Sequence, residues 1–163
     1  MTHDQTVSAV AFNPDGKYVV SGGDTTARVW EASTGREAAR MIHDAEVTSI
    51  AFSPDGNHVI SGSGDNTGRV WEAFSGREVV RLIHDDIVTA VAFSPDGRYV
   101  VSGSNDNTAR IWYWQHAKLI ENVCAFLPRN LTRAEWQQYI GDGLPYEAVC
   151  PNLPVEPEVI PYP

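Results

Sequence analysis

The sequence predicts an all-β fold made of three repeats of one antiparallel four-stranded unit, the third repeat lacking its outer strand, followed by a short two-helix extension. Two observations predict this fold. Three near-copies of one segment end at Trp30, Trp71 and Trp112, and these tryptophans stand 41 residues apart both times. Within each copy, short apolar stretches alternate with turn residues. Units repeated at such a period stack on one another, because none of them can bury its apolar face alone.

The second copy shows how each repeat divides into strands. Val47 to Phe52 alternates β-branched and small residues, and Ser-Pro-Asp-Gly at 53–56 then favours a tight turn, since proline presets φ and glycine accepts a positive φ. Three further strand-like stretches follow, each bounded by turn residues, at 58–61, 67–72 and 78–83. Four short strands with a turn about every ten residues predict an antiparallel meander. A meander repeated at this length is one blade of a β-propeller.

Histidine and tryptophan keep fixed places in every copy. Each histidine lies nine residues before the phenylalanine that ends the first strand, as His43 does before Phe52. On these residues the chain resembles WD-repeat β-propellers over roughly residues 3–113. The family's Gly-His pair is replaced by Thr2-His3, Ile42-His43 and Ile83-His84, and its Trp-Asp pair by Trp30-Glu31, Trp71-Glu72 and Trp112-Tyr113. The resemblance implies three blades, at about 3–42, 43–83 and 84–114, within a domain of residues 1–116.

Every copy also contains a serine, a histidine and an aspartate, which is the composition of a nucleophilic catalytic triad. Two observations favour a structural role instead: the set occurs three times, and no G-x-S-x-G turn surrounds a serine. The resemblance to WD-repeat proteins implies that each set joins the strand tryptophan in a hydrogen-bonded tetrad. The expected tetrads are His3, Ser21, Asp24 and Trp30; His43, Ser61, Asp65 and Trp71; and His84, Ser102, Asp106 and Trp112. We therefore expect no catalytic residue and no enzymatic activity.

Composition argues against several function classes. The formal net charge of −9 argues against nucleic acid and anionic membranes as partners. No apolar run resembles a signal peptide or reaches the length of a membrane span, so we expect a cytoplasmic protein. No phosphate-binding loop and no zinc-ligand spacing is present, and we expect no cofactor and no metal. Cys124 and Cys150 are expected to be reduced thiols, with a disulfide between them as the open alternative, and His58 and His116 are expected at the surface.

Charge separates the two rims of such a blade array. The connections from the fourth to the first strand and from the second to the third strand share one rim, which carries most of the aspartates. Apart from the tetrad aspartates, the acidic residues expected there are Asp4, Asp44, Glu46, Asp85 and Asp86. The turns on the opposite rim carry Lys17, Arg36, Arg77 and Arg98. Solvation of surface charge explains the pattern simply, and a docking site for a basic peptide is the sharper hypothesis.

Residues 117–163 follow a different pattern. Apolar residues at helical spacing predict a helix over 117–127, and Thr132 with Glu135 has the capping-box spacing of a second helix that ends near Ile140. Five of the thirteen residues in 151–163 are proline, which predicts a frayed or loosely packed tail. Pro151, Pro154 and Pro157 recur at the polyproline II period, so a docking ligand for an aromatic groove is the open alternative.

The same segment resembles the C-terminal end of bacterial, especially cyanobacterial, WD-repeat receptors of the STAND NTPase type. The resemblance is most specific from Leu127 to Gln138 and from Cys150 to Pro154. In such receptors a nucleotide-binding switch domain precedes the propeller, which acts as the sensor. The resemblance therefore implies a sensing or docking role and no receptor enzymology for these residues.

Three blades are fewer than a closed propeller contains, since complete rings have about four to eight. Blades one and three should each expose an apolar face, and the predicted helices should cover part of blade three through Leu119, Ile120, Val123, Phe126 and Trp136. We expect a non-catalytic protein-interaction module, a scaffold or sensor piece completed by self-association or by a propeller fragment of another polypeptide. Its partner would be a protein or peptide, basic if it binds the acidic rim. The alternative function is a C-terminal sensor fragment of a STAND-type signal-transduction receptor, active only in complex with the nucleotide-binding part.

Overall fold

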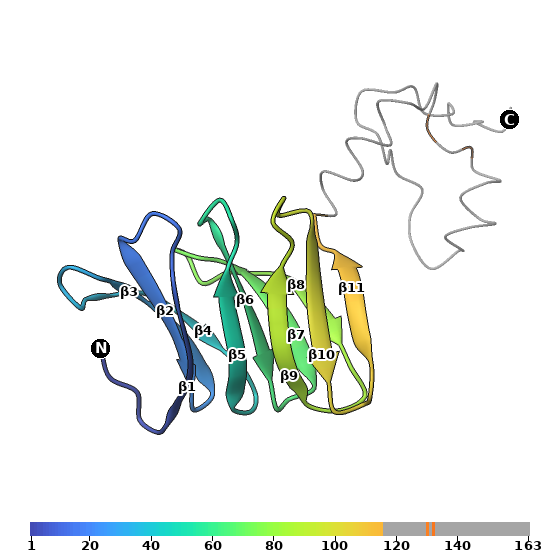
Figure 1. Ribbon diagram of the computed structural model, residues 1–163, viewed down its shortest axis with the longest axis horizontal. Helices are drawn as coiled ribbons and strands as arrows, with labels where there is room; N and C mark the ends of the chain where they lie inside the picture. Colours follow the sequence, from blue (N-terminus) through green and yellow to red (C-terminus); the bar gives the residue numbers. More distant parts are fainter. Residues whose placement is uncertain (116–129, 131, 133–163) are drawn as a thin grey trace, which may run out of the picture. The chain divides into compact units, whose positions relative to one another are not determined.

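The computed structural model describes residues 1–115, 130 and 132, which contain three antiparallel sheets (Figure 1). Blade 1 contains β1 (Val7–Phe12), β2 (Tyr18–Gly23), β3 (Thr26–Glu31) and β4 (Glu37–Ile42). Blade 2 contains β5 (Val47–Phe52), β6 (His58–Ser63), β7 (Thr67–Glu72) and β8 (Glu78–Ile83). Blade 3 contains β9 (Val88–Phe93), β10 (Tyr99–Ser104) and β11 (Ala109–Tyr113). The predicted all-β fold of three antiparallel units, the third with three strands, is confirmed for these residues.

Residues Met1–Trp114 form one compact unit. The predicted helix over 117–127, the second helix after Thr132, the proline-rich tail and the receptor-like segment lie outside the described residues. The same is true of His116, Cys124 and Cys150. No helix in the described part of the chain is long and apolar enough to cross a membrane.

Each blade opens with a hairpin whose turn contains Pro-Asp-Gly. The glycines Gly16, Gly56 and Gly97 have φ of 72°, 73° and 70°, a region that residues with a side chain rarely enter. In blade 2 the Gly56 N–H donates to the Ser53 carbonyl at 2.9 Å and closes the turn. The turn sequence therefore fixes where the first strand ends and in which register the second strand returns.

The blades stack through their inner strands, with β1 beside β5 and β5 beside β9 (Figure 1). Glycines on the second strands permit this close approach. A Cβ placed on Gly22 would lie 2.6 Å from a methyl carbon of Val47, and one on Gly62 would lie 2.9 Å from a methyl carbon of Val88. The hydroxyl of Ser8 also donates to the Val47 carbonyl across the same junction.

The hydrophobic core lies between the blades. One cluster includes Val20 and Val29 of blade 1 together with Ile50 and Phe52 of blade 2. A second cluster joins blade 2 to blade 3 in the same way. Each blade therefore depends on a neighbouring blade to bury its apolar face, as repeat architectures require.

Candidate functional site

One rim of the blades carries the connections β2–β3, β4–β5, β6–β7, β8–β9 and β10–β11, at the lower edge of Figure 1. The predicted tetrad residues gather there, because the histidine precedes the first strand of a blade and the aspartate lies between its second and third strands. The structure brings the four residues of every predicted set into contact.

In blade 2 the four side chains form a continuous chain of hydrogen bonds. The Trp71 indole N–H donates to Ser61 Oγ at 2.8 Å, Ser61 Oγ lies 2.7 Å from His43 Nε2, and His43 Nδ1 lies 2.9 Å from Asp65 Oδ2. This chain of bonds from indole to carboxylate is the relay of the blade. Ser61 and His43 are buried, so the relay supplies partners to polar atoms that water cannot reach.

Blade 3 repeats the relay at nearly the same distances. The Trp112 indole donates to Ser102 Oγ at 2.8 Å, and Ser102 Oγ lies 2.7 Å from His84 Nε2. His84 Nδ1 lies 2.8 Å from Asp106 Oδ2. Two blades thus hold their rim loops with the same geometry.

The relay of blade 1 is looser at its outer end. Trp30 and His3 both contact Ser21 Oγ at 2.7 Å, but His3 Nδ1 lies 3.4 Å from Asp24 Oδ2 and makes no hydrogen bond. The connection β2–β3 is one residue shorter than its counterpart in blade 2, and Asp24 itself takes a positive φ of 38°. In blades 2 and 3 the positive φ falls on Asn66 and Asn107, the residues that follow the relay aspartates. Loop length therefore sets how closely the aspartate reaches the histidine.

The relay of blade 2 combines an ionised aspartate with a neutral histidine. Burial alone would raise the pKa of Asp65, but hydrogen bonds from Thr67 and His43 together hold this pKa far below its usual range. Burial lowers the pKa of His43, and this outweighs the raising influence of the Asp65 carboxylate. The hydrogen-bond network then assigns the proton to His43 Nδ1, which donates to Asp65, while Nε2 accepts from the Ser61 hydroxyl.

An arginine completes each network, and the sequence interpretation did not include it. In blade 2 the Arg69 side chain is buried, and its Nη2 donates to Asp65 Oδ2 at 2.6 Å and to Asp44 Oδ2 at 2.9 Å. Its Nε donates to the Thr67 hydroxyl and its Nη1 to the Ile42 carbonyl. Arg69 therefore ties the relay aspartate to the β4–β5 connection, through which the chain passes from blade 1 into blade 2.

The corresponding arginines act alike in the other blades. Arg28 contacts Asp4 at 3.1 Å and Asp24 at 3.4 Å, and Arg110 contacts Asp85 at 3.0 Å and Asp106 at 3.1 Å. The signal was present in the sequence, since every copy reads Asp, one residue, Thr, one residue, Arg. A cation four residues after a partly buried aspartate is the natural partner for its charge.

These arginines change the expected charge of the acidic rim. Asp4, Asp44 and Asp85 are largely exposed, yet each has one oxygen bound to an arginine. Each blade thus has two aspartates, the exposed one and the relay aspartate, bound to one arginine. Together these three side chains leave one net negative charge per blade at this rim. Glu46 and Asp86 are exposed and add further negative charge in blades 2 and 3. The rim stays acidic but carries less free acidity than the sequence suggests.

The relay serines are poorly placed for nucleophilic attack. Ser61 and Ser102 are fully buried, and each Oγ already accepts the indole N–H of its tryptophan. A nucleophile must be reached by its substrate, so this arrangement favours the structural role. Among the described residues, no group of histidine, cysteine and carboxylate side chains could hold a metal ion.

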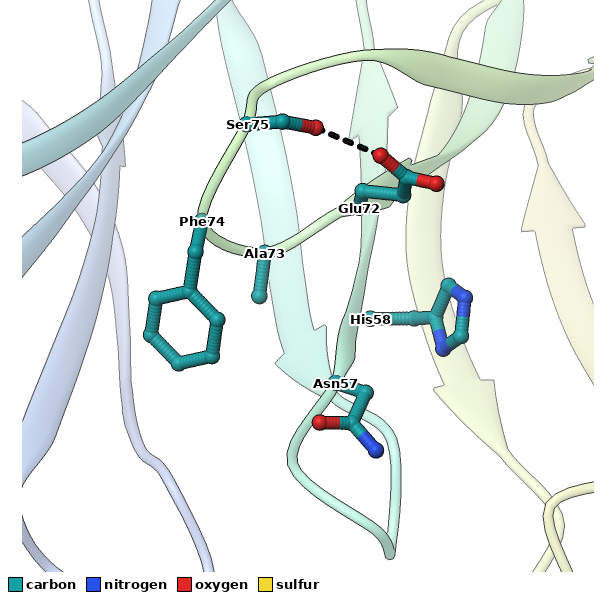
Figure 2. A pocket seen from close by; sticks show the side chains of 6 residues that line it. All are labelled: Asn57, His58, Glu72, Ala73, Phe74 and Ser75. Atoms are coloured by element: carbon teal, nitrogen blue, oxygen red, sulfur yellow. Dashed lines mark hydrogen bonds between the residues drawn. The ribbon is translucent and has the colours of Figure 1, made fainter.

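The opposite rim offers an open pocket of about 460 Å³ in blade 2 (Figure 2). Asn57, His58, Glu72, Ala73, Phe74 and Ser75 line it. Hydrogen bonds from Arg77 and Ser75 lower the pKa of Glu72 to about 2, so its carboxylate already has partners. The other predicted cations of this rim are likewise paired within their own turns: Lys17 with Asp15, Arg36 with Glu31, and Arg98 with Asp96. This pocket is the weaker candidate site, since its charged group is already neutralised.

His58 is less exposed than a residue at an open surface, although it lines this pocket. The His58 ring is half-buried and lies against Trp114 of blade 3, with ring centroids 4.6 Å apart. Burial lowers its pKa. Tyr18 occupies the same position in blade 1 and lies 4.8 Å from Phe74 of blade 2, so this position contributes to blade stacking. The sequence offered the clue that aromatic or histidine residues stand there in all three copies.

Stacked antiparallel blades with a polar relay at one rim define a repeat protein of the β-propeller type. A family model described as "WD domain, G-beta repeat" matches residues 1–31, 39–72 and 76–113. The second and third matches each begin at the outer strand of one blade, β4 or β8, and continue through the first three strands of the next blade. The chain belongs to the WD-repeat family. Domains built from these repeats are typically non-catalytic modules that mediate protein–protein interactions.

Proposed function

We propose that the chain is a scaffold piece that binds a basic segment of a partner protein along the acidic rim. The observation that carries the proposal is the repetition, once per blade, of an exposed carboxylate held by an arginine of the third strand: Asp4, Asp44 and Asp85. The arginines tie these carboxylates to the relay aspartates, so a partner meets charges that are already positioned. Pre-positioned groups cost less ordering entropy on binding.

Electrostatics supports a basic partner. Each blade keeps one net negative charge at the rim, and Glu46 and Asp86 add to it, while the cations of the opposite rim are paired within their own turns. Complementary charge raises association rates and makes binding depend on salt. A partner with spaced lysine or arginine residues fits this rim best.

The proposal is tested by selecting binders for the 163-residue chain from a random peptide library. Enriched peptides should be rich in lysine and arginine, and their affinity should fall steeply as salt is raised. The double variant Glu46→Gln/Asp86→Asn should weaken binding, because it removes two rim charges that make no ion pair with an arginine. The matched control Glu31→Gln/Glu37→Gln removes two charges elsewhere and should leave binding unchanged. The proposal would be contradicted if the enriched peptides were apolar and if their affinity changed neither with salt nor in either double variant.

The alternative role, as the sensor end of a STAND-type receptor, depends on the resemblance of residues 119–154. Those residues lie almost entirely outside the described part of the chain, and nothing in the three blades favours that role over general scaffolding. It stays a prediction from the sequence.

A further inference from the structure

Blade 1 exposes apolar side chains of its first strand, whereas the corresponding side chains of blade 2 are buried. Val10 is 66% exposed and Phe12 is 69% exposed, whereas Ile50 and Phe52, their counterparts in blade 2, are only 8% and 9% exposed. Val7 is also exposed, while its counterpart Val47 is fully buried against blade 1. These three side chains thus form an unpartnered face made of the same residue types that build the existing junction.

Blade 3 exposes the opposite, receiving face. Val20 and Val29 of blade 1 are fully buried by blade 2, but their counterparts in blade 3, Val101 and Ile111, are 39% and 75% exposed. The glycine of the junction is present as well. A Cβ on Gly103 would lie 3.9 Å from Ala90 of its own blade and would approach nothing more closely among the described residues, in contrast to the tight approach at Gly22.

The polar contacts of the junction show the same incomplete pattern. The Ser8 and Thr48 hydroxyls donate to the Val47 and Val88 carbonyls of the next blade. The corresponding hydroxyl of blade 3, Thr89, is exposed and donates to Gly103 of its own sheet at 3.3 Å. The donor for a further blade is therefore in place, and its acceptor would be the carbonyl at the position of Val7.

We propose that blade 1 of a second copy of this chain docks on blade 3, through the same junction that the molecule already makes twice. Val7, Val10 and Phe12 of one copy pack on Val101, Gly103 and Ile111 of the other, as their counterparts do within the chain. The two faces differ from each other, so the contact is head to tail, and a head-to-tail contact can close into a ring. Two copies of three blades give a six-bladed ring, within the usual range of about four to eight.

One position of the new junction departs from the existing pattern. Tyr18 and His58 each receive an aromatic ring from the next blade, Phe74 and Trp114. In blade 1 the position of Phe74 is occupied by Ser33, which has no ring to offer to Tyr99 of the other copy. Tyr99 instead contacts Tyr113 of its own blade, with ring centroids 5.9 Å apart. The junction between copies therefore lacks this ring contact and should separate before the junctions within the chain.

Sedimentation of the full chain at micromolar concentration tests the ring. The wild type should sediment at twice the chain mass of 17.9 kDa, and Val10→Asp should sediment at 17.9 kDa. The matched control is Ile83→Asp, because Ile83 is 65% exposed although blade 2 has a neighbour on each side. This control should stay dimeric. A wild type that is monomeric at every concentration would overturn the proposal, and a series of species that grows with concentration would overturn the closed ring.

Mixing two monomeric variants tests the head-to-tail arrangement. Val10→Asp damages only the blade 1 face, and Ile111→Asp damages only the blade 3 face. Each variant alone should be monomeric, and their mixture should form a heterodimer through the one junction left intact. Dimers of either variant alone would show a contact between two identical faces and would overturn the assignment. Circular dichroism of both variants verifies that the blades stay folded.

Discussion

At the scale of single residues, the relay and its arginine explain why polar side chains can lie inside a β protein at this rim. The Asp65 carboxylate receives hydrogen bonds from His43, from the Thr67 backbone and side chain, and from Arg69. The Arg69 side chain in turn uses all three of its nitrogen positions. Because every member has several partners, removing one charge leaves another buried charge uncompensated.

Asp65→Asn should therefore be strongly destabilising. The amide has nearly the same shape but no charge, so Arg69 loses its buried counter-ion. Loss of one member of a buried ion pair typically costs about 3 kcal/mol or more in the free energy of unfolding. Urea denaturation should show this loss. The control Glu37→Gln breaks an exposed pair with Arg40 and should cost less than about 1 kcal/mol. Equal costs for the two variants would contradict the role given to Asp65.

The charge state of the relay also predicts an acid-sensitive stability. The pKa of His43 is lowered in the folded protein, so below its ordinary value of 6.5 the unfolded chain binds a proton that the folded chain does not. Unfolding then takes up protons, and stability falls as pH falls, by at most about 1.4 kcal/mol per pH unit for one group. The pKa of Asp65 is also lowered in the folded protein, so stability falls further when the pH drops near and below 3.8, the ordinary pKa of an aspartate.

The melting temperature of the wild type should thus drop when the pH is lowered from about 7.5 to about 5.5. His43→Asn should melt lower than the wild type at the higher pH, because the relay is broken, but should lose less on acidification. Parallel pH profiles for the two proteins would show that His43 does not carry the effect.

The sequence predicted the membership of the three residue sets through the family resemblance, and the structure brings these residues together. It did not predict the arginines, because strand alternation alone does not show that Arg69 and Arg110 lie beside the relay aspartates. It also did not predict that His58 lies against Trp114 of another blade. In both cases the contact depends on how strands pack in three dimensions, which the order of residues along the chain does not show.

At the scale of elements, strand positions followed from local sequence, because alternation and Pro-Asp-Gly turns determine them. Three of the four strands predicted in the second copy have the bounds of β5, β7 and β8. The remaining strand, β6, continues two residues beyond the predicted end, through Gly62 and Ser63. Gly62 pairs with Ser49 and Gly68, and pairing on both sides outweighs the weak strand propensity of glycine.

The short β2–β3 connection gives a prediction at this scale. Inserting a serine between Gly22 and Gly23 and changing Thr25→Asn reproduces the loop of blade 2. Asp24 should then leave its positive φ, which costs of order 1 kcal/mol or more in a residue with a side chain, and should bond to His3. The melting temperature should rise. Thr25→Asn without the insertion is the control and should give no gain. A lower melting temperature for the full change would mean that the loose relay is not caused by loop length.

At the scale of the whole molecule, stability depends on how closely adjacent blades approach. Gly62→Ala should be destabilising by about 1–3 kcal/mol, because the added methyl would lie 2.9 Å from a methyl carbon of Val88 in blade 3. Gly103→Ala, at the matching position of the last blade, should be nearly neutral. Both changes are best measured in the Val10→Asp background, where only junctions within the chain remain. Similar costs at the two sites would contradict the stacking described for these glycines.

The sequence also predicted that blades 1 and 3 expose apolar faces, since three repeats make only two junctions. It could not say which side chains lie on those faces, because strand alternation alone does not tell which side meets the preceding blade. The burial contrast between Phe12 and Phe52 supplies that direction.

Hydrogen exchange of the tryptophan indoles, followed by nitrogen-15 NMR, tests the central claim most directly. By that claim, a buried relay from indole to carboxylate fixes the rim loops of blades 2 and 3. The Nε1–H signals of Trp71 and Trp112 should exchange far more slowly than a free indole, and Ser61→Ala should accelerate exchange at Trp71 while Trp112 stays protected. Exchange at free-indole rates in the folded wild type would contradict the relay.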